Sequence, residues 1–263
     1  MGDAGVRVAL IQVECNDTES VDDRIDRVLG ETDRVLGEAD LVVLPELWNT
    51  GAFDLASARH HAQPLDGDLV SRMAGIAQRH STWLHGGSFT EQADDGHFFN
   101  TSVLFGPDGA LEAVYRKIHV FGYGGEADLM SAGPELVVVN TPLGATGLAT
   151  CYDLRFPEQF RELTRHGASA FLITSGWPSA RIHAWDVLVR ARAIEDQAWV
   201  IGCNQVGLQR GVHLGGHSAV IDPIGDVVSR ASTEETILSA TVAPDAVEQW
   251  RGEFPALGDI VPF

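Results

Sequence analysis

Residues 148–158 read Leu-Ala-Thr-Cys-Tyr-Asp-Leu-Arg-Phe-Pro-Glu, and there an apolar run of strand character gives way to a charged run of helical character. Cys151 stands at the change. A corner between a strand and a helix lifts a side chain out of the sheet and points backbone N–H groups at the atom it attacks. The stretch therefore predicts an α/β fold with a nucleophilic thiol at Cys151. The alternative interpretation of a single cysteine is a small buried hydrophobic side chain.

Outward from this corner, strand-like runs alternate with segments of helical character. Helices are predicted over residues 21–36, 69–80, 157–166 and 183–196. Strands are predicted over residues 6–13, 41–44, 82–89, 98–105, 111–115, 136–139, 147–150, 170–174, 198–203, 217–221, 227–229 and 236–241.

This inventory combines βαβ crossovers with hairpins, so we expect mixed sheets. One open sheet of so many strands would be unusual, and the helices need apolar surfaces to cover. We therefore predict two sheets packed face to face, with helices outside. No Pro/Ser-rich linker, low-complexity tract or internal repeat divides residues 1–263, so we expect a single domain.

The composition is typical of a soluble globular protein and argues against two classes of partner. Hydrophobic residues make up 44% and charged residues 21%, and no apolar window approaches the length of a membrane span. Acidic residues outnumber basic ones by 37 to 18, which gives a net charge of −19. Such a surface repels phosphate backbones and anionic lipids, so neither a nucleic acid nor a membrane is expected as partner.

The N-terminus and the cysteines both indicate a cytoplasmic protein. Asp3 precedes the first apolar run, and residues 1–13 show neither the basic segment nor the cleavage site of a secretory signal. Cys15, Cys151 and Cys203 lie far apart, form no CxxC pair and leave an odd count. This pattern predicts neither a disulfide framework nor a zinc site.

A metal site at His213 and His217 is not expected. Their spacing is met in metal-binding helices, but Gly215 and Gly216 make a regular helix improbable, and no Cys or acidic ligand lies nearby in the sequence. No metal and no cofactor is predicted for this chain.

Charged or reactive side chains directly follow three of the predicted strands. Glu46 follows the sequence LVVLP, Lys117 follows LEAVYR, and Cys151 follows GLAT. Open α/β sheets gather their active sites at the carboxyl ends of strands, so we expect the three side chains to lie close together. Taken singly, Glu46 and Lys117 would also fit a structural ion pair or solvated charges.

These three groups suit the attack of a thiol on an amide. A lysine at about 4 Å would lower a thiol pKa by about three units, and a nearby glutamate would offset that shift. We therefore expect Glu46 to deprotonate Cys151 during the attack, in place of a stable thiolate. Lys117 and the N–H of Tyr152 would stabilise the oxyanion, and protonated Glu46 would donate to the leaving amine.

Five segments of the chain resemble the nitrilase superfamily of carbon–nitrogen hydrolases. The three signature segments are LPELWNTG at 44–51, YRKIHVF at 115–121 and CYDLRFPE at 151–158, in the order and with the rough spacing of the family. ARAIEDQ at 191–197 and GHSAVIDP at 216–223 extend the resemblance over nearly the whole chain.

The resemblance implies a fold and a set of roles. The fold is a four-layer α-β-β-α sandwich that commonly dimerises, so we expect a homodimer or a higher homo-oligomer. Glu46 would be the general base, Lys117 the oxyanion-stabilising residue and Cys151 the nucleophile. Glu126 matches a second glutamate that orients the substrate and the deacylating water in many members of the family.

Within the family, the chain resembles amidases. Nitrilases usually follow the nucleophile with Trp-Glu, and D-carbamoylases tend to carry paired arginines where this chain has Leu154 as the first of the two. Tyr152 and Trp177 are expected to position the substrate. The chain resembles most the ω-amidase-like group, which hydrolyses the terminal amides of small oxo-acids. This resemblance lies in Trp177-Pro178, RAIE at 192–195 and GCN at 202–204.

The sequence therefore predicts a cofactor-independent amidase that releases ammonia from a small linear carboxamide through a thioester on Cys151. Three alternatives stay open: an N-carbamoyl amidohydrolase, an acyltransferase that passes the same thioester to an amine, and a catalytically silent binding or scaffold protein. Arg155 is a candidate for binding a substrate carboxylate or for a structural salt bridge with Glu158 or another acid. Departures from the ω-amidase pattern at Gly122, Met130 and Ala184, positions that could line the pocket, leave the acyl group undecided.

Overall fold

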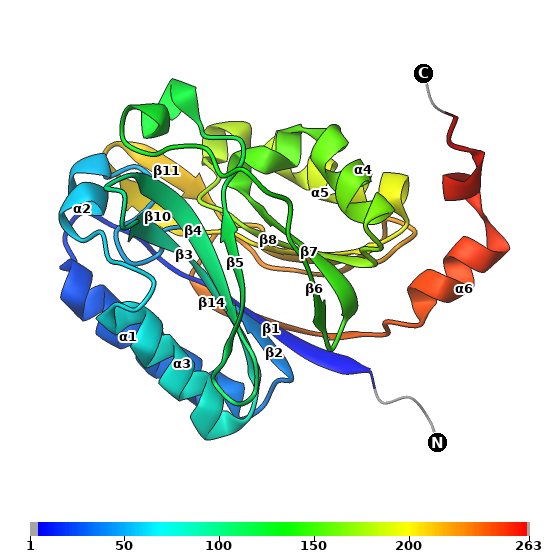
Figure 1. Cartoon of the computed structure of the whole chain (residues 1–263), viewed down its shortest axis with the longest axis horizontal. Helices are drawn as coiled ribbons and strands as arrows, with labels where there is room; N and C mark the ends of the chain where they lie inside the picture. Colours follow the sequence, from blue (N-terminus) through cyan, green and yellow to red (C-terminus); the bar gives the residue numbers. More distant parts are fainter. Residues whose placement is uncertain (1–4, 262–263) are drawn as a thin grey trace.

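Two six-stranded sheets pack face to face, with helices against both outer faces (Figure 1). The structure is a computed structural model that describes residues 5–261. The order of layers is helices, sheet, sheet, helices. This arrangement confirms the predicted α-β-β-α sandwich of two mixed sheets.

The first sheet has the strand order β14-β1-β2-β3-β4-β5. These strands are β14 (Thr236–Val242), β1 (Val6–Gln12), β2 (Leu41–Val43), β3 (Trp83–Gln92), β4 (Phe98–Phe105) and β5 (Leu111–Arg116). β1, β2 and β3 are parallel, and β4 and β5 continue the sheet by antiparallel pairing. Because two reversals restore the direction, β2 and β5 end at the same edge of the sheet.

The second sheet has the order β13-β12-β9-β8-β7-β6. Its strands are β13 (Val227–Arg230), β12 (Ala219–Ile221), β9 (Trp199–Cys203), β8 (Ala170–Thr174), β7 (Gly144–Thr150) and β6 (Val138–Thr141). β7, β8 and β9 are parallel, with Leu148 opposite Leu172 and Leu172 opposite Ile201. A separate hairpin joins β10 (Val206–Gln209) to β11 (Val212–Gly215).

Helices α1 (Val21–Leu36) and α3 (Asp68–His80) cover the first sheet, and α4 (Pro157–Arg165) and α5 (Ile182–Asp196) cover the second (Figure 1). Pro157 occupies the first turn of α4, where its missing N–H costs no hydrogen bond. The remaining helices are α2 (Leu55–His60), α6 (Ala246–Glu253) and the short 3₁₀ helices η1 (Gly122–Gly124), η2 (Glu126–Asp128), η3 (Cys151–Arg155), η4 (Ser179–Arg181) and η5 (Ala256–Asp259).

The core consists of three apolar layers that follow from strand alternation. In β2, Leu41 and Val43 point between the two sheets, whereas Val42 points towards α1 and α3. Phe160 and Trp185 fill the layer between the second sheet and its helices. Both faces of each central strand are therefore buried, which explains why these strands read as continuous apolar runs.

The predicted strands and helices agree with the observed ones to within a few residues at each end. Four elements, β10, β11, α2 and α6, were not predicted from the sequence. α2 has six residues and α6 has eight, so both are too short for their apolar spacing to show a helical period.

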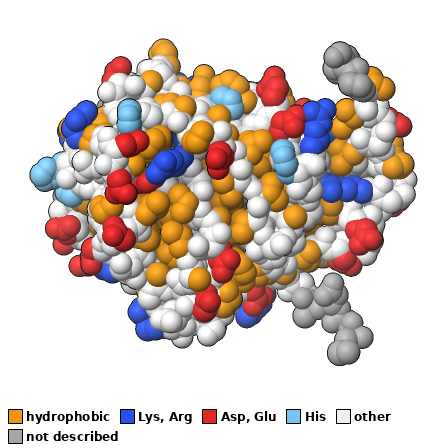
Figure 2. All heavy atoms as spheres, in the orientation of Figure 1, with side chains coloured by type: hydrophobic (Ala, Val, Ile, Leu, Met, Phe, Trp, Pro, Cys, Tyr) orange, Lys and Arg blue, Asp and Glu red, His pale blue; other side chains and the backbone are white. Residues whose placement is uncertain are grey.

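Acidic side chains are scattered over the face shown in Figure 2, with hydrophobic side chains visible between them. The negative charge is therefore spread over this face and is not gathered in one patch. Within residues 5–261, no helix has both the length and the apolar character that crossing a membrane requires.

Candidate active site

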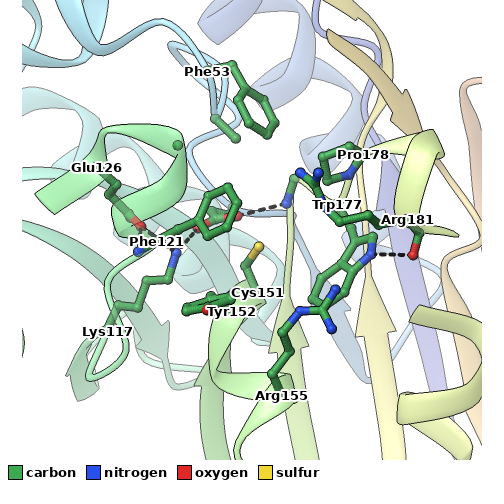
Figure 3. Close-up of a pocket in the computed structure, with 14 residues that line it drawn as sticks. Phe53, Lys117, Phe121, Glu126, Cys151, Tyr152, Arg155, Trp177, Pro178 and Arg181 are labelled. Atoms are coloured by element: carbon green, nitrogen blue, oxygen red, sulfur yellow. Dashed lines mark hydrogen bonds and ion pairs between the residues drawn. The ribbon is translucent and has the colours of Figure 1, made fainter. Parts of the chain in front are cut away.

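The three residues predicted from strand ends meet in one pocket. Glu46 lies just beyond β2, Lys117 directly follows β5, and Cys151 directly follows β7. Glu46 and Lys117 leave the same edge of the first sheet, and Cys151 reaches them from the second sheet. They line one pocket, whose walls also include Tyr152 (Figure 3).

The turn at Cys151 is strained and tightly held. Cys151 has a φ of 48°, in the left-handed region that costs a residue with a side chain roughly 1–2 kcal/mol. The backbone N–H of Thr150 donates to Oδ2 of Asp153 at 2.9 Å and closes the corner. As a result the sulfur points into the pocket and not along the strand (Figure 3).

Three donors orient the buried carboxylate of Glu46. Oε1 accepts from Nζ of Lys117 and from Nδ2 of Asn100, both at 2.8 Å, and Oε2 accepts from the backbone N–H of Gly176 at 2.8 Å. A side chain at position 176 would not fit, because a Cβ there would lie 2.4 Å from Cβ of Ala52. Glycine therefore lets the backbone approach the carboxylate closely.

Lys117 lies between two carboxylates and is buried. It is the only lysine in the sequence, and its Nζ donates to Glu126 Oε2 and to Glu46 Oε1, each at 2.8 Å. Burial disfavours the charge of Lys117, but Glu126 and Glu46 outweigh burial and raise its pKa well above the usual value. Burial likewise favours neutral Glu126, but Lys117 and Asn100 outweigh it and lower the pKa of Glu126. The pocket thus holds a permanent ammonium.

Asn100 was not predicted as a site residue, and it joins the two glutamates. It lies on β4, and its Nδ2 donates to Oε1 of Glu46 at 2.8 Å and to Oε1 of Glu126 at 2.7 Å. Asn100 is the first of three consecutive polar residues in β4, and nothing in that run distinguishes it as part of a site. Only the pairing of strands in the first sheet places it beside Glu46.

Cys151 rests as a thiol. Burial is the largest cause that raises its pKa, and the negative charge of Glu46 adds to it, while Lys117 opposes them and is outweighed. Cys15 and Cys203 are fully buried away from the pocket, so Cys151 is the accessible cysteine of residues 5–261. The balance of charges agrees with the expectation that no stable thiolate forms.

The aromatic walls of the pocket include both predicted positioning residues. Tyr152 packs against Phe121, with ring centroids 4.9 Å apart. Trp177 is held by its backbone N–H, which donates to Asn204 at 2.6 Å, and by Nε1, which donates to the carbonyl of Arg181 at 2.8 Å. Cζ of Arg155 lies 4.9 Å from the centre of the Trp177 ring (Figure 3).

Several other expectations find no place at the pocket. Within residues 5–261, Arg155 forms no ion pair with Glu158 or another acid, and its guanidinium lies beside the Trp177 ring instead. Gly122, Met130 and Ala184, which depart from the ω-amidase pattern, do not line the pocket. Met130 is buried in a small separate cluster with Leu47 and Ala58.

His217, one of the two histidines at which no metal site was expected, lies against a carboxylate. Nδ1 of His217 lies 2.9 Å from a carboxylate oxygen of Asp186. Within residues 5–261, no three His, Cys, Asp or Glu side chains are grouped so that they could hold a metal ion.

Comparisons with known proteins agree with this architecture. The model of the carbon-nitrogen hydrolase family matches residues 7–252. The chain is 43% identical to 2-oxoglutaramate amidase of Paenarthrobacter nicotinovorans, over 96% of this chain and 88% of that protein. It is 31% identical to omega-amidase NIT2 of Mus musculus, over 95% and 93% of the two chains.

A solved structure has the same fold. A CN-hydrolase superfamily protein from Xanthomonas campestris superposes with a TM-score of 0.90 at 32% identity, and the match covers 98% of both chains. Family model, relatives and fold all lead to one assignment: the chain belongs to the carbon–nitrogen hydrolase family.

Proposed function

We propose that this protein is an amidase that hydrolyses the terminal amide of a small linear oxo-acid to the acid and ammonia. The observation that carries the proposal is the thiol of Cys151, which shares one pocket with Glu46 and Lys117. The names of the relatives, 2-oxoglutaramate amidase and omega-amidase, support the choice of amide.

In the first half of the reaction, Glu46 takes the thiol proton while the sulfur of Cys151 attacks the amide carbon. The carbonyl electrons move to oxygen, and Lys117 and the N–H of Tyr152 stabilise the oxyanion. Glu46 then gives its proton to the nitrogen, and the C–N bond breaks. Ammonia leaves, and the acyl group remains on Cys151 as a thioester. Because Cys151 rests as a thiol, its proton is transferred during the attack.

In the second half, Glu46 accepts a proton from water as the oxygen attacks the thioester. The C–S bond breaks, and Glu46 returns the proton to the sulfur. Glu126 keeps Lys117 in place through two hydrogen bonds of 3.1 and 2.8 Å and orients the attacking water. Tyr152 and Trp177 form walls against which a short acyl chain packs.

We also propose that residues 1–263 act as one cytoplasmic carbon–nitrogen hydrolase domain that forms a homodimer. The family resemblance supports dimerisation, and the net charge of −19 argues against nucleic-acid and lipid partners. Sedimentation velocity tests the oligomeric state.

A panel of oxo-acid amides, simple aliphatic amides and N-carbamoyl compounds tests the reaction. We expect ammonia release from the oxo-acid amides and, by intact-protein mass spectrometry, an acyl adduct that Cys151→Ala loses. Cys15→Ala, which changes a buried cysteine outside the pocket, is the matched control. An active Cys151→Ala enzyme would contradict the proposal. Carbon dioxide release would indicate the carbamoyl alternative, turnover only with an added amine would indicate acyl transfer, and no turnover on any compound would favour a scaffold.

A further inference from the structure

Almost every arginine of this acidic chain has an oxygen partner. The sequence has 17 arginines, all within the described residues, and 14 of them pair with a carboxylate or a backbone carbonyl. In residues 5–261, the three whose guanidinium has neither partner are Arg59, Arg155 and Arg181. Arg155 and Arg181 both line the pocket that contains Cys151, and Arg59 does not.

Arg181 is held in place by aromatic rings and not by an anion. Its Cζ lies 5.6 Å from the ring centre of Phe121 and 6.0 Å from that of Tyr123. Rings at these distances attract a guanidinium by a cation–π interaction and leave its N–H donors free for another partner. The first turn of α5, which begins just after Arg181, contains no acidic residue and has no side-chain cap. The positive end of that helix therefore adds to the charge of Arg181.

The position of Arg181 relative to the sulfur indicates what it recognises. Phe121 contacts Tyr152 on one side, with centroids 4.9 Å apart, and Arg181 on the other. Arg181 thus stands one aromatic ring away from Tyr152, the neighbour of Cys151, and lines the same pocket as the sulfur (Figure 3). A linear substrate with its amide at Cys151 would place its far end near this guanidinium.

We propose that Arg181 is a specificity-determining residue that binds a carboxylate at the end of the substrate opposite the amide. Arg155 is the other cation of this pocket without an oxygen partner. This inference rests on the proposed amidase function and assigns the residue that recognises the free carboxylate of its substrate. A planar guanidinium matches a carboxylate through two parallel hydrogen bonds. It also offsets the repulsion that a chain of net charge −19 exerts on an anionic substrate.

The first test compares two amides that differ only at the far end. Glutaramate ends in a carboxylate, and pentanamide ends in a methyl group. For Arg181→Met we expect KM for glutaramate to rise about 10- to 100-fold, because a charged hydrogen-bonded contact is lost. The value of kcat/KM for pentanamide should stay within about twofold of the wild-type value. Arg181→Lys should recover part of the loss. Arg59→Met, which removes the unpaired arginine outside the pocket, should leave both amides unchanged.

A second test needs no turnover. Glutarate should protect Cys151 of the wild type from iodoacetamide, and Arg181→Met should need at least tenfold more glutarate for the same protection. Equal losses on both amides in Arg181→Met, or weakened glutarate binding only in Arg155→Met, would overturn the assignment. If the wild type hydrolyses no amide, the proposed function fails, and glutarate protection alone decides whether Arg181 binds a carboxylate.

Discussion

Tyr115 donates a hydrogen bond of 2.6 Å to Asp153, and this buried pair joins the segments that carry Lys117 and Cys151. Tyr115 precedes Lys117 by two residues, and Asp153 follows Cys151 by two. Burial, together with the charge of Asp153, raises the pKa of Tyr115 well above its usual value, so the phenol remains a donor. The relative position of the ammonium and the thiol therefore depends on a contact outside the pocket.

Tyr115→Phe should consequently lower both stability and turnover. The change removes the donor to Asp153 and leaves the Nε2 of Gln159 without its 2.9 Å acceptor. We expect a loss of about 1–3 kcal/mol in unfolding free energy, and a larger fall in kcat than rise in KM, because the pocket walls stay in place. Urea unfolding and steady-state kinetics check both. Tyr123→Phe, at an exposed ring, is the control, and unchanged kcat in Tyr115→Phe would contradict the argument.

Glu46→Gln should separate the reactivity of the thiol from turnover. Glu46 is the largest cause after burial that raises the pKa of Cys151. Without that charge the pKa falls, so a larger fraction of Cys151 is thiolate at pH 8 and iodoacetamide alkylates it faster. Turnover should fall about 10²- to 10⁴-fold, because the general base is lost.

The rates of alkylation and of ammonia release, measured on the same preparation, test whether the first rises while the second falls. Glu158→Gln removes an exposed glutamate at the start of α4 and should change neither rate. Slower alkylation of Glu46→Gln would show that Glu46 activates the thiol more than its charge suppresses ionisation.

The sequence was sufficient to predict the site residues at the strand ends, but not the residues that surround them. Glu46, Lys117 and Cys151 could be placed because each follows an apolar run whose carboxyl end must reach a sheet edge. Asn100 could not, since its role depends on which strand of the first sheet lies beside which. Arg181 could not be predicted either. An arginine becomes a candidate for binding an anion only when the structure shows that no acidic side chain pairs with it.

Asn100→Asp should shift the pH dependence of the reaction. The amide donates to both glutamates, and its bond to Glu126 is one of the causes that keep the pKa of that carboxyl low; a carboxylate in its place would repel Glu126 and raise that pKa. Activity is then lost earlier as the pH falls, because a protonated Glu126 no longer gives Lys117 a charged partner. The acid limb of kcat/KM should therefore move up by about one pH unit, with a smaller loss at pH 8 than at pH 6. Asn140→Asp, at an exposed position on β6, is the control, and an unmoved acid limb would count against this role of Asn100.

His85 should make the protein sensitive to acid. It is fully buried on β3, and burial lowers its pKa from 6.5 to about 4. Because the unfolded chain binds this proton below pH 6.5 and the folded protein does not until about pH 4, stability from neutral His85 falls as the pH drops through that window. Between pH 7 and 5 the loss is about 2 kcal/mol. We therefore compare, by urea unfolding, how far the unfolding free energy of two variants falls between pH 7 and pH 5. The fall should be smaller in His85→Asn, by about 2 kcal/mol, than in the exposed control His213→Asn. Equal pH dependence in the two variants would refute the assignment.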